Sequence, residues 1–163
     1  MKFFDTNALI ELYDGDFLEK FYISSITQCE LESIKISQSK DEQTKYKTRQ
    51  ILHRLNENLN YQVVVFNELI EKILDEEMLP HTSDNEICAC AAYLKNLGTD
   101  VTFVTGDLNC KIIARDIFKL PVADIYEKKE HYTGFLEVEL NDEGMAEFYG
   151  NLTINKFNLL TNQ

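Results

Sequence analysis

Short apolar segments alternate with longer stretches of helical periodicity through most of the chain. The apolar segments predict β-strands at residues 2–5, 21–24, 61–66, 101–105 and 122–124. Parallel strands need crossover connections, and helical crossovers cover both faces of a sheet. The pattern therefore predicts an α/β fold with a central parallel sheet of about five strands.

A long polar stretch between the second and third predicted strands, from about Asp41 to Asn58, has the periodicity of an amphipathic helix. Ile51, Leu55 and Leu59 form its apolar edge, and the other positions are largely polar or charged. We expect this helix to pack on the sheet or to reach over a cleft.

The pattern changes after residue 126. Apolar and polar residues alternate from 134 to 140, and an Asn-Asp-Glu-Gly turn follows. This alternation is typical of a strand with one buried face. We therefore expect a main domain over residues 1–130 and a small C-terminal β appendage over residues 131–163.

Size and composition fit one self-sufficient core. The chain has 163 residues, of which 44% are hydrophobic, and its formal net charge is −12. The acidic balance argues against a surface that coats nucleic acid broadly, although a local basic stripe can coexist with it.

The chain has four cysteines, Cys29, Cys88, Cys90 and Cys110, which show no Cys-x-x-Cys pairing and lie in apolar stretches of the sequence. This pattern favours reduced, buried thiols in a cytoplasmic protein over a zinc site. No apolar run reaches the roughly 18 residues of a membrane span. The histidines are scattered on polar segments and are expected to be solvated.

Acidic residues recur where a predicted strand or loop gives way to a helix: Asp5, Glu30, Asp84 and Asp107. Gly106 allows the backbone to turn sharply before the last of them. The carboxyl ends of parallel strands open on one edge of the sheet, where ligands bind. Carboxylates gathered there repel one another unless protons or a cation neutralise them, so the pattern predicts a Mg²⁺ or Mn²⁺ site.

Helix capping is the ordinary alternative for these acids. Asp5 suits the N-cap of the helix that follows it, and Glu30 could complete a capping box with Thr27. Ser83 could cap the helix in whose first turn Asp84 lies. Capping accounts for each acid separately, but it does not require acids at several crossovers that open on one edge.

At these residues the chain resembles the PIN domains, a family of metal-dependent ribonucleases. The similarity runs in order over roughly residues 1–125, and its motifs are Phe4–Asn7, Thr27–Leu31, the helix from Asp84 to Ala91, and Thr105–Asn109. Each motif is short, but four in the right order make the match fairly specific.

The resemblance implies a three-layer α/β/α sandwich with the strand order 3-2-1-4-5. It also implies a Mg²⁺- or Mn²⁺-dependent endoribonuclease that uses one or two ions to hydrolyse single-stranded RNA, leaving a 5′-phosphate and a 3′-hydroxyl. Catalytic and metal-binding roles fall on Asp5, Glu30, Asp84 and Asp107, and supporting roles on Asn7, Thr105 and Asn109.

Cationic residues lie beside the predicted site. Lys111 and Arg115 follow Asp107 on one helical face and are expected to bind RNA. Others flank the long polar helix: Lys35, Lys40, Lys45, Lys47, Arg49 and Arg54. A solvated face is the alternative for both groups.

The segment His131–Phe135 and the strand predicted after it resemble the region that follows the amino-terminal PIN domain of PhoH-like proteins, in which an ATPase domain comes next. The chain has no Walker A sequence. It is therefore expected to be either such an amino-terminal domain or a free-standing relative, and the extra tail fits a small VapC-type toxin less well. A homo-oligomer is left open.

Two other classes of function compete with the nuclease. The same fold could serve as a non-catalytic RNA-binding or docking module. Response regulators and phosphatases also gather acids around Mg²⁺ at strand ends, but a phosphatase of that kind would begin with Asp-x-Asp, whereas this chain has Asp5-Thr6-Asn7.

Overall fold

The computed structural model describes residues 1–15, 17, 19–57 and 60–125. The β appendage expected over residues 131–163 lies outside this part of the chain, and so does Leu59. Within it, no helix is long and apolar enough to cross a lipid bilayer.

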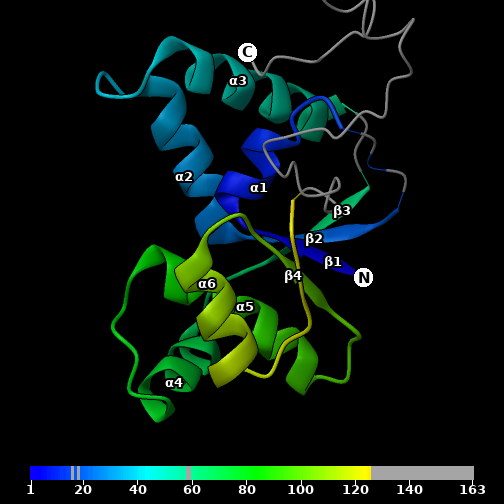
Figure 1. The fold of residues 1–163 in the computed structure, drawn as a ribbon, viewed down its shortest axis with the longest axis vertical. Coiled ribbons are helices and arrows are strands. Elements are labelled where there is room, and N and C mark those ends of the chain that lie inside the picture. Colours follow the sequence, from blue (N-terminus) through cyan, green and yellow to red (C-terminus); the bar gives the residue numbers. More distant parts are fainter. Residues whose placement is uncertain (16, 18, 58–59, 126–163) are drawn as a thin grey trace, which may run out of the picture. The chain divides into compact units, whose positions relative to one another are not determined.

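The described residues form a five-stranded sheet in the order β3-β2-β1-β4-β5, in which every pair of neighbours is parallel (Figure 1). This confirms the predicted sheet and its order. The strands are β1 (Lys2–Phe4), β2 (Phe21–Ser24), β3 (Tyr61–Val64), β4 (Thr102–Val104) and β5 (Val122–Ala123).

Successive residues of the central strands point to opposite faces of the sheet, as the pleat requires. Phe3 is in register with Phe103, and their rings lie 6.0 Å apart in one hydrophobic cluster. Phe4 is in register with Val104, and both belong to a second cluster on the other face. Burial on both faces explains why these strands read as continuous apolar runs rather than alternating ones.

Helices cover both faces and complete the three layers (Figure 1). The cluster of Phe4 includes buried residues from α1 (Thr6–Glu11), α2 (Ser25–Ile36) and α3 (Glu42–Glu57). The cluster of Phe3 includes residues from α4 (Glu68–Glu76), α5 (Ser83–Asn96), α6 (Leu108–Ile112) and the π-helical turn η1 (Ile113–Ile117).

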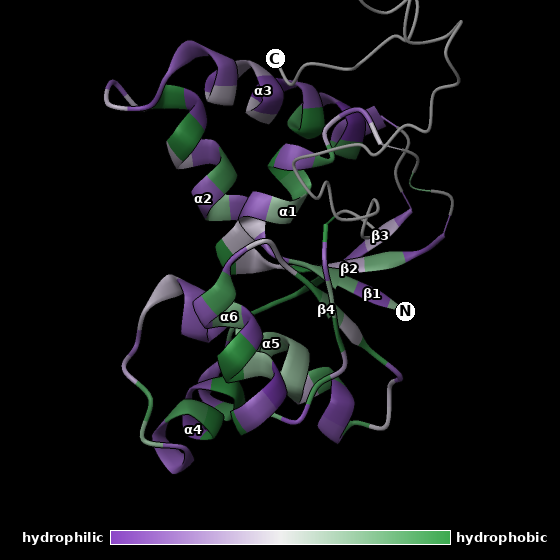
Figure 2. Cartoon of the chain, viewed as in Figure 1, coloured by the Kyte–Doolittle hydropathy of each residue, from purple (hydrophilic) through white to green (hydrophobic). Residues whose placement is uncertain are grey.

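The long polar helix expected near residues 41–58 is α3. It is mainly hydrophilic along its length (Figure 2), and the predicted apolar positions Ile51 and Leu55 are buried. Arg54 lies near its end and donates hydrogen bonds to the carbonyls of Tyr13 and Gly15, at 2.6 and 2.7 Å. The helix therefore anchors the loop between α1 and β2.

The order in which the chain adds strands to the sheet reverses between β1 and β4. From β1 the chain adds β2 and β3 on one side, and β4 and β5 lie on the other side. In open parallel sheets the connections after two such strands leave in opposite directions and open a crevice at their carboxyl ends. Asp5 follows β1 and Asp107 follows β4, so the topology places both at this crevice.

Candidate functional site

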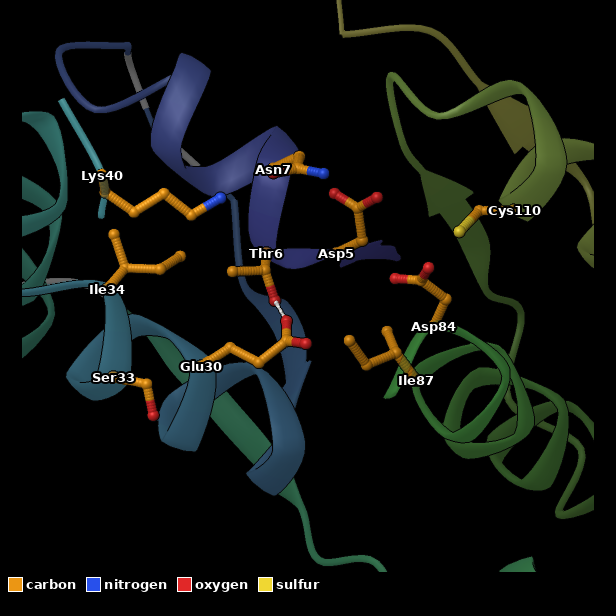
Figure 3. A pocket seen from close by; sticks show the side chains of 10 residues that line it. All are labelled: Asp5, Thr6, Asn7, Glu30, Ser33, Ile34, Lys40, Asp84, Ile87 and Cys110. Carbon is orange, nitrogen blue, oxygen red and sulfur yellow. Dashed lines mark hydrogen bonds between the residues drawn. The ribbon is translucent and has the colours of Figure 1, made fainter. Parts of the chain in front are cut away.

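Three of the four predicted acids, Asp5, Glu30 and Asp84, line one cavity of about 300 Å³. They come from separate parts of the chain, the end of β1, the middle of α2 and the start of α5 (Figure 3). The other lining residues are Thr6, Asn7, Ser33, Ile34, Lys40, Ile87 and Cys110.

Asp5 is both a helix cap and a cavity residue. Its Oδ1 atom accepts a hydrogen bond from the backbone N–H of Ala8 at 2.6 Å, which caps α1. Its Oδ2 atom accepts a hydrogen bond from the hydroxyl of Thr105. The side chain is buried, with 5% exposure, so these two donors fix its orientation.

Glu30 does not complete a capping box, so that alternative is wrong. Ser24 caps α2, because its hydroxyl accepts the hydrogen bond from the backbone N–H of Thr27 at 2.8 Å. Glu30 lies farther along the helix, and its carboxylate accepts a hydrogen bond from the hydroxyl of Thr6 (Figure 3). Its side chain is thereby turned toward the acid at the end of β1.

Asp84 lies in the first turn of α5, and the cap of this helix is Thr82 rather than the expected Ser83. The hydroxyl of Thr82 accepts from the backbone N–H of Asn85 at 3.4 Å. Asp84 itself makes no hydrogen bond or ion pair with any residue that the structure describes. Both of its carboxylate oxygens are therefore available to a ligand.

Asp107 lies beside the cavity and is not one of its lining residues. Its Oδ1 atom caps α6 by accepting from the backbone N–H of Cys110 at 2.8 Å. Gly106, just before it, lies against Ile125, where an added Cβ would come within 2.6 Å of the Ile125 side chain. Glycine is therefore needed at this position because the backbone lies too close to the Ile125 side chain to leave room for a Cβ atom.

Like charges and burial disfavour ionisation in this cluster. Burial raises the pKa of Asp5, the negative charges of Asp84 and Asp107 raise it further, and hydrogen bonds from Thr105 and Ala8 act against them. Burial also raises the pKa of Asp84, and Glu30 and Asp107 add to the effect. Within residues 1–125 as described, none of the four acids forms an ion pair with a cationic side chain.

The cluster has the donor chemistry of a divalent-cation site. Carboxylate oxygens are the hard ligands that Mg²⁺ and Mn²⁺ prefer. In the described part of the chain, however, no three Asp, Glu, His or Cys side chains converge closely enough to hold an ion as they stand. The residues therefore fit the group chemically, and their carboxylates would have to rotate toward one another.

The predicted supporting and RNA-binding residues have different surroundings. Asn7 lines the cavity, and Asn109 is exposed and does not. Lys111 forms an ion pair with Asp124, and Arg115 forms one with its neighbour Asp116. Neither cation lines the cavity.

Thr6 and Cys110 also line the site, although they were not predicted to do so, and Lys40 lines it too, which the sequence offered only as one of six cations flanking the long polar helix. Thr6 lies between the predicted Asp5 and Asn7, so its position in the motif was the available signal. A hydrogen bond with Cys88 and burial raise the pKa of Cys110. A protonated thiol is a poor metal ligand, which leaves the carboxylates as the donors of choice.

The other cysteines are free thiols, as expected. Cys88 and Cys90 are buried, and burial raises the pKa of Cys90 to about 12. Cys29 is exposed, so the expectation that all of the cysteines are buried is wrong for it. It lies on the outer side of α2, where an apolar neighbourhood in sequence does not imply burial.

Comparison with known proteins agrees with this architecture. A family model described as "PIN domain" matches residues 3–123. No curated protein sequence matches the chain.

Solved structures resemble the chain at low sequence identity. FitAcB from Neisseria gonorrhoeae is 18% identical over 77% of this chain and 98% of its own, with a TM-score of 0.50. FitAB bound to the IR36 DNA fragment is 18% identical over 81% of this chain and 100% of its own, with a TM-score of 0.51. VapBC2 from Rickettsia felis bound to a promoter DNA fragment is 16% identical over 76% of this chain and 97% of its own, with a TM-score of 0.49.

The family match extends from β1 to β5 and includes every element that carries a predicted acid. It separates the chain from the response regulators and phosphatases that gather acids in a similar way. The chain belongs to the PIN domain family, whose members are generally metal-dependent nucleases.

Proposed function

We propose that this protein is a Mg²⁺- or Mn²⁺-dependent endoribonuclease that hydrolyses phosphodiester bonds of single-stranded RNA. The observation that carries the proposal is that Asp5, Glu30 and Asp84 line one cavity at the switch point of the sheet, with no cation paired to them among the described residues. Asp107 lies close enough to raise the pKa of Asp5 and Asp84 and is the fourth member of the cluster.

In this proposal the acids hold the ion with different degrees of freedom. Asp5 is fixed by its two hydrogen-bond donors, and Glu30 is held by Thr6. Asp84 has no partner in the described chain and is free to turn toward the ion. When bound, the divalent ion supplies Lewis acidity that activates water and stabilises charge on the phosphate.

Electrostatics supports cation binding here. The raised pKa of Asp5 and of Asp84 means that the cluster favours binding a positive charge, which can be a proton or a metal ion. At neutral pH a divalent ion would relieve the repulsion without protonating the carboxylates. The free energy gained by relieving this repulsion would offset the cost of rotating the carboxylates toward one another.

The assignment of single-stranded RNA rests on the resemblance to the ribonucleases of the family. The chain is acidic overall, with a net charge of −12, so substrate binding has to come from local groups and the metal rather than from a basic surface.

The test is cleavage of a labelled single-stranded RNA with Mn²⁺ by the purified protein and by Asp84→Asn. Asp84 makes no hydrogen bond in the described structure, so its substitution should leave the fold intact. Glu86→Gln is a matched control, because it removes an acid from the same helical turn that does not line the cavity. Cleavage by the wild type and by Glu86→Gln, with loss in Asp84→Asn, is the expected result.

Activity that is equal in the wild type and Asp84→Asn would point to a contaminant and reject the assignment. Absence of cleavage by the folded wild type would reject it as well. Circular RNA offers no ends, so its cleavage identifies an endonuclease.

A second candidate function is a non-catalytic RNA-binding or docking module. The observation that favours it is that no three acids converge closely enough to hold a metal in the described residues. Affinity for RNA that persists in the presence of a chelator, without cleavage, would identify this function.

The finer family assignment is a proposal as well. The features that resemble PhoH-like proteins lie at residues 131–135, outside the described residues, and an ATPase domain as partner rests on them. Co-purification with an ATPase, or an ATPase sequence in the same reading frame, would support this part. Free thiols at Cys29, Cys88, Cys90 and Cys110 support a cytoplasmic location.

A further inference from the structure

Lys40 brings a positive charge to the acidic cavity. It lines the cavity together with Asp5, Glu30 and Asp84. Figure 3 shows its side chain entering from the side opposite Asp84, with the ammonium group directed inward near Asn7. The cavity thus has carboxylates along one part of its wall and an ammonium group on another.

The neighbouring lysines are occupied with acids of their own. Lys35 pairs with Glu32 at 2.5 Å, and Lys45 pairs with Glu42 at 2.8 Å. Lys40 forms no hydrogen bond or ion pair with any residue in the described ranges. Its charge is therefore available to a ligand that enters the cavity.

Local hydrogen bonds hold the short loop that carries Lys40. This loop joins α2 to α3. On one side, the backbone N–H of Ser39 donates to the hydroxyl of Ser37 at 3.2 Å. On the other, the carboxylate of Asp41 accepts from the backbone N–H of Thr44 at 2.9 Å and caps α3. The backbone on both sides of Lys40 is thus restrained, and its exposed side chain lines the cavity.

We propose that Lys40 binds a backbone phosphate of the RNA that enters this cavity. The inference rests on the proposed function and assigns one contact of its substrate. An ammonium group is a suitable point-charge partner for a phosphate oxygen. A phosphate between Lys40 and the acids would meet the ammonium group on one side and, on the other, the divalent ion that the carboxylates would hold under the proposed function.

Lys40 is a better candidate for this contact than Lys111 and Arg115, the two cations that were expected to bind RNA. Lys111 is paired with Asp124, and Arg115 is paired with Asp116, so a phosphate would have to compete with a carboxylate for either of them. Neither lines the cavity, whereas Lys40 does. In a chain of net charge −12, a single unpaired cation at the site has a large effect on whether RNA approaches it.

The experiment compares Lys40→Gln with Lys35→Gln, which removes the same charge from a lysine that does not line the cavity. Cleavage of single-stranded RNA is followed between about 50 and 200 mM salt, where each phosphate contact contributes about 0.7 to the slope of log affinity against log salt. We expect Lys40→Gln to raise KM about tenfold and to reduce the salt slope by about 0.7, with Lys35→Gln close to wild type. Lys40→Arg keeps the charge and should recover most of the loss.

A second measurement separates this inference from the proposed function. RNA affinity is measured by fluorescence anisotropy in the Asp84→Asn background, alone and combined with Lys40→Gln or with Lys35→Gln. A drop in affinity and in salt slope on adding Lys40→Gln supports the phosphate contact even where the wild type does not cleave RNA. Equal affinity and slope for Lys40→Gln and Lys35→Gln would overturn it, even if the wild type cleaves and Asp84→Asn does not.

Discussion

The hydroxyl of Thr105 donates a hydrogen bond to the carboxylate of Asp5, which lies 100 residues earlier in the chain. The same hydroxyl oxygen accepts a hydrogen bond from the backbone N–H of Asp107 at 3.0 Å. The hydroxyl proton is therefore directed toward Asp5. One buried threonine thus ties the end of β1 to the loop after β4, on the two sides of the switch point.

Removing this hydroxyl should loosen the site. Thr105→Val keeps the shape of the fully buried side chain, but it leaves the Asp5 carboxylate short of a donor and the Asp107 N–H short of an acceptor. We expect a loss of about 1 to 3 kcal/mol in the free energy of unfolding. Urea denaturation measures it. Thr105→Ser is the control, because it keeps the hydroxyl. Equal destabilisation by both variants would contradict the role given to the hydrogen bonds.

The same variant should change the ionisation of Asp5. The hydrogen bond from Thr105 lowers the pKa of Asp5 against the effect of burial. Its loss in Thr105→Val should move that pKa further upward, and any activity that needs the ionised carboxylate should require a higher pH. The pH profile of cleavage measures this shift, and an unchanged profile would contradict it.

Asp84→Asn should stabilise the metal-free protein at neutral pH. The pKa of Asp84 is raised in the folded state, so the folded protein binds a proton more readily than the unfolded chain does, and stability falls as pH rises through the folded pKa. Asn avoids this loss. The residue is exposed, so solvent screening should limit the gain to about 1 kcal/mol or less.

Denaturation in a chelator at two pH values tests this sign. The advantage of Asp84→Asn should be present near pH 7.5 and should vanish near pH 3, where both states of the wild type are protonated. Glu86→Gln in the same helical turn serves as the control. An advantage for Asp84→Asn that persists at the low pH would exclude charge repulsion as its cause.

The strands and the positions of the acids could be predicted because buried strands leave a strong signal. Phe3 and Phe4 face opposite sides of the sheet and are both buried, so the run of apolar residues marks the strand and Asp5 marks its end. Topology then brings Asp5 and Asp107 to the same crevice without further information.

Capping residues and single cations were harder to predict. Thr82 and Ser83 are adjacent and both suit an N-cap, so the sequence could not rank them, and the backbone geometry selects Thr82. Lys40 lies in a loop without periodicity. What distinguishes it from Lys35 and Lys45 is that those two lysines form ion pairs with nearby acids in the folded structure.

Divalent metal should stabilise the wild type and not the acid variants. Binding to the folded state alone stabilises by mass action, by about 2.7 kcal/mol at an ion concentration one hundred times the dissociation constant. We expect thermal denaturation to show a rise in Tm with Mn²⁺ or Mg²⁺ that a chelator reverses. The rise should be lost in Asp84→Asn and retained in Glu86→Gln. A wild-type Tm that does not respond to either ion would count against a metal site.

Arg54 should matter for stability but not for the chemistry. Its guanidinium donates to the carbonyls of Tyr13 and Gly15 and lies 5.3 Å from the centre of the Phe17 ring. Arg54→Met keeps much of the apolar contact but removes both donors, and should lower the free energy of unfolding by about 1.5 to 3 kcal/mol. Arg54→Lys should recover little, because an ammonium group cannot match the forked geometry.

Both variants should cleave RNA at the wild-type rate below their Tm, since Arg54 does not line the cavity. Limited proteolysis at the loop after α1 measures the loosening directly. A loss of cleavage in a folded Arg54→Met protein would show that this loop also acts on the site.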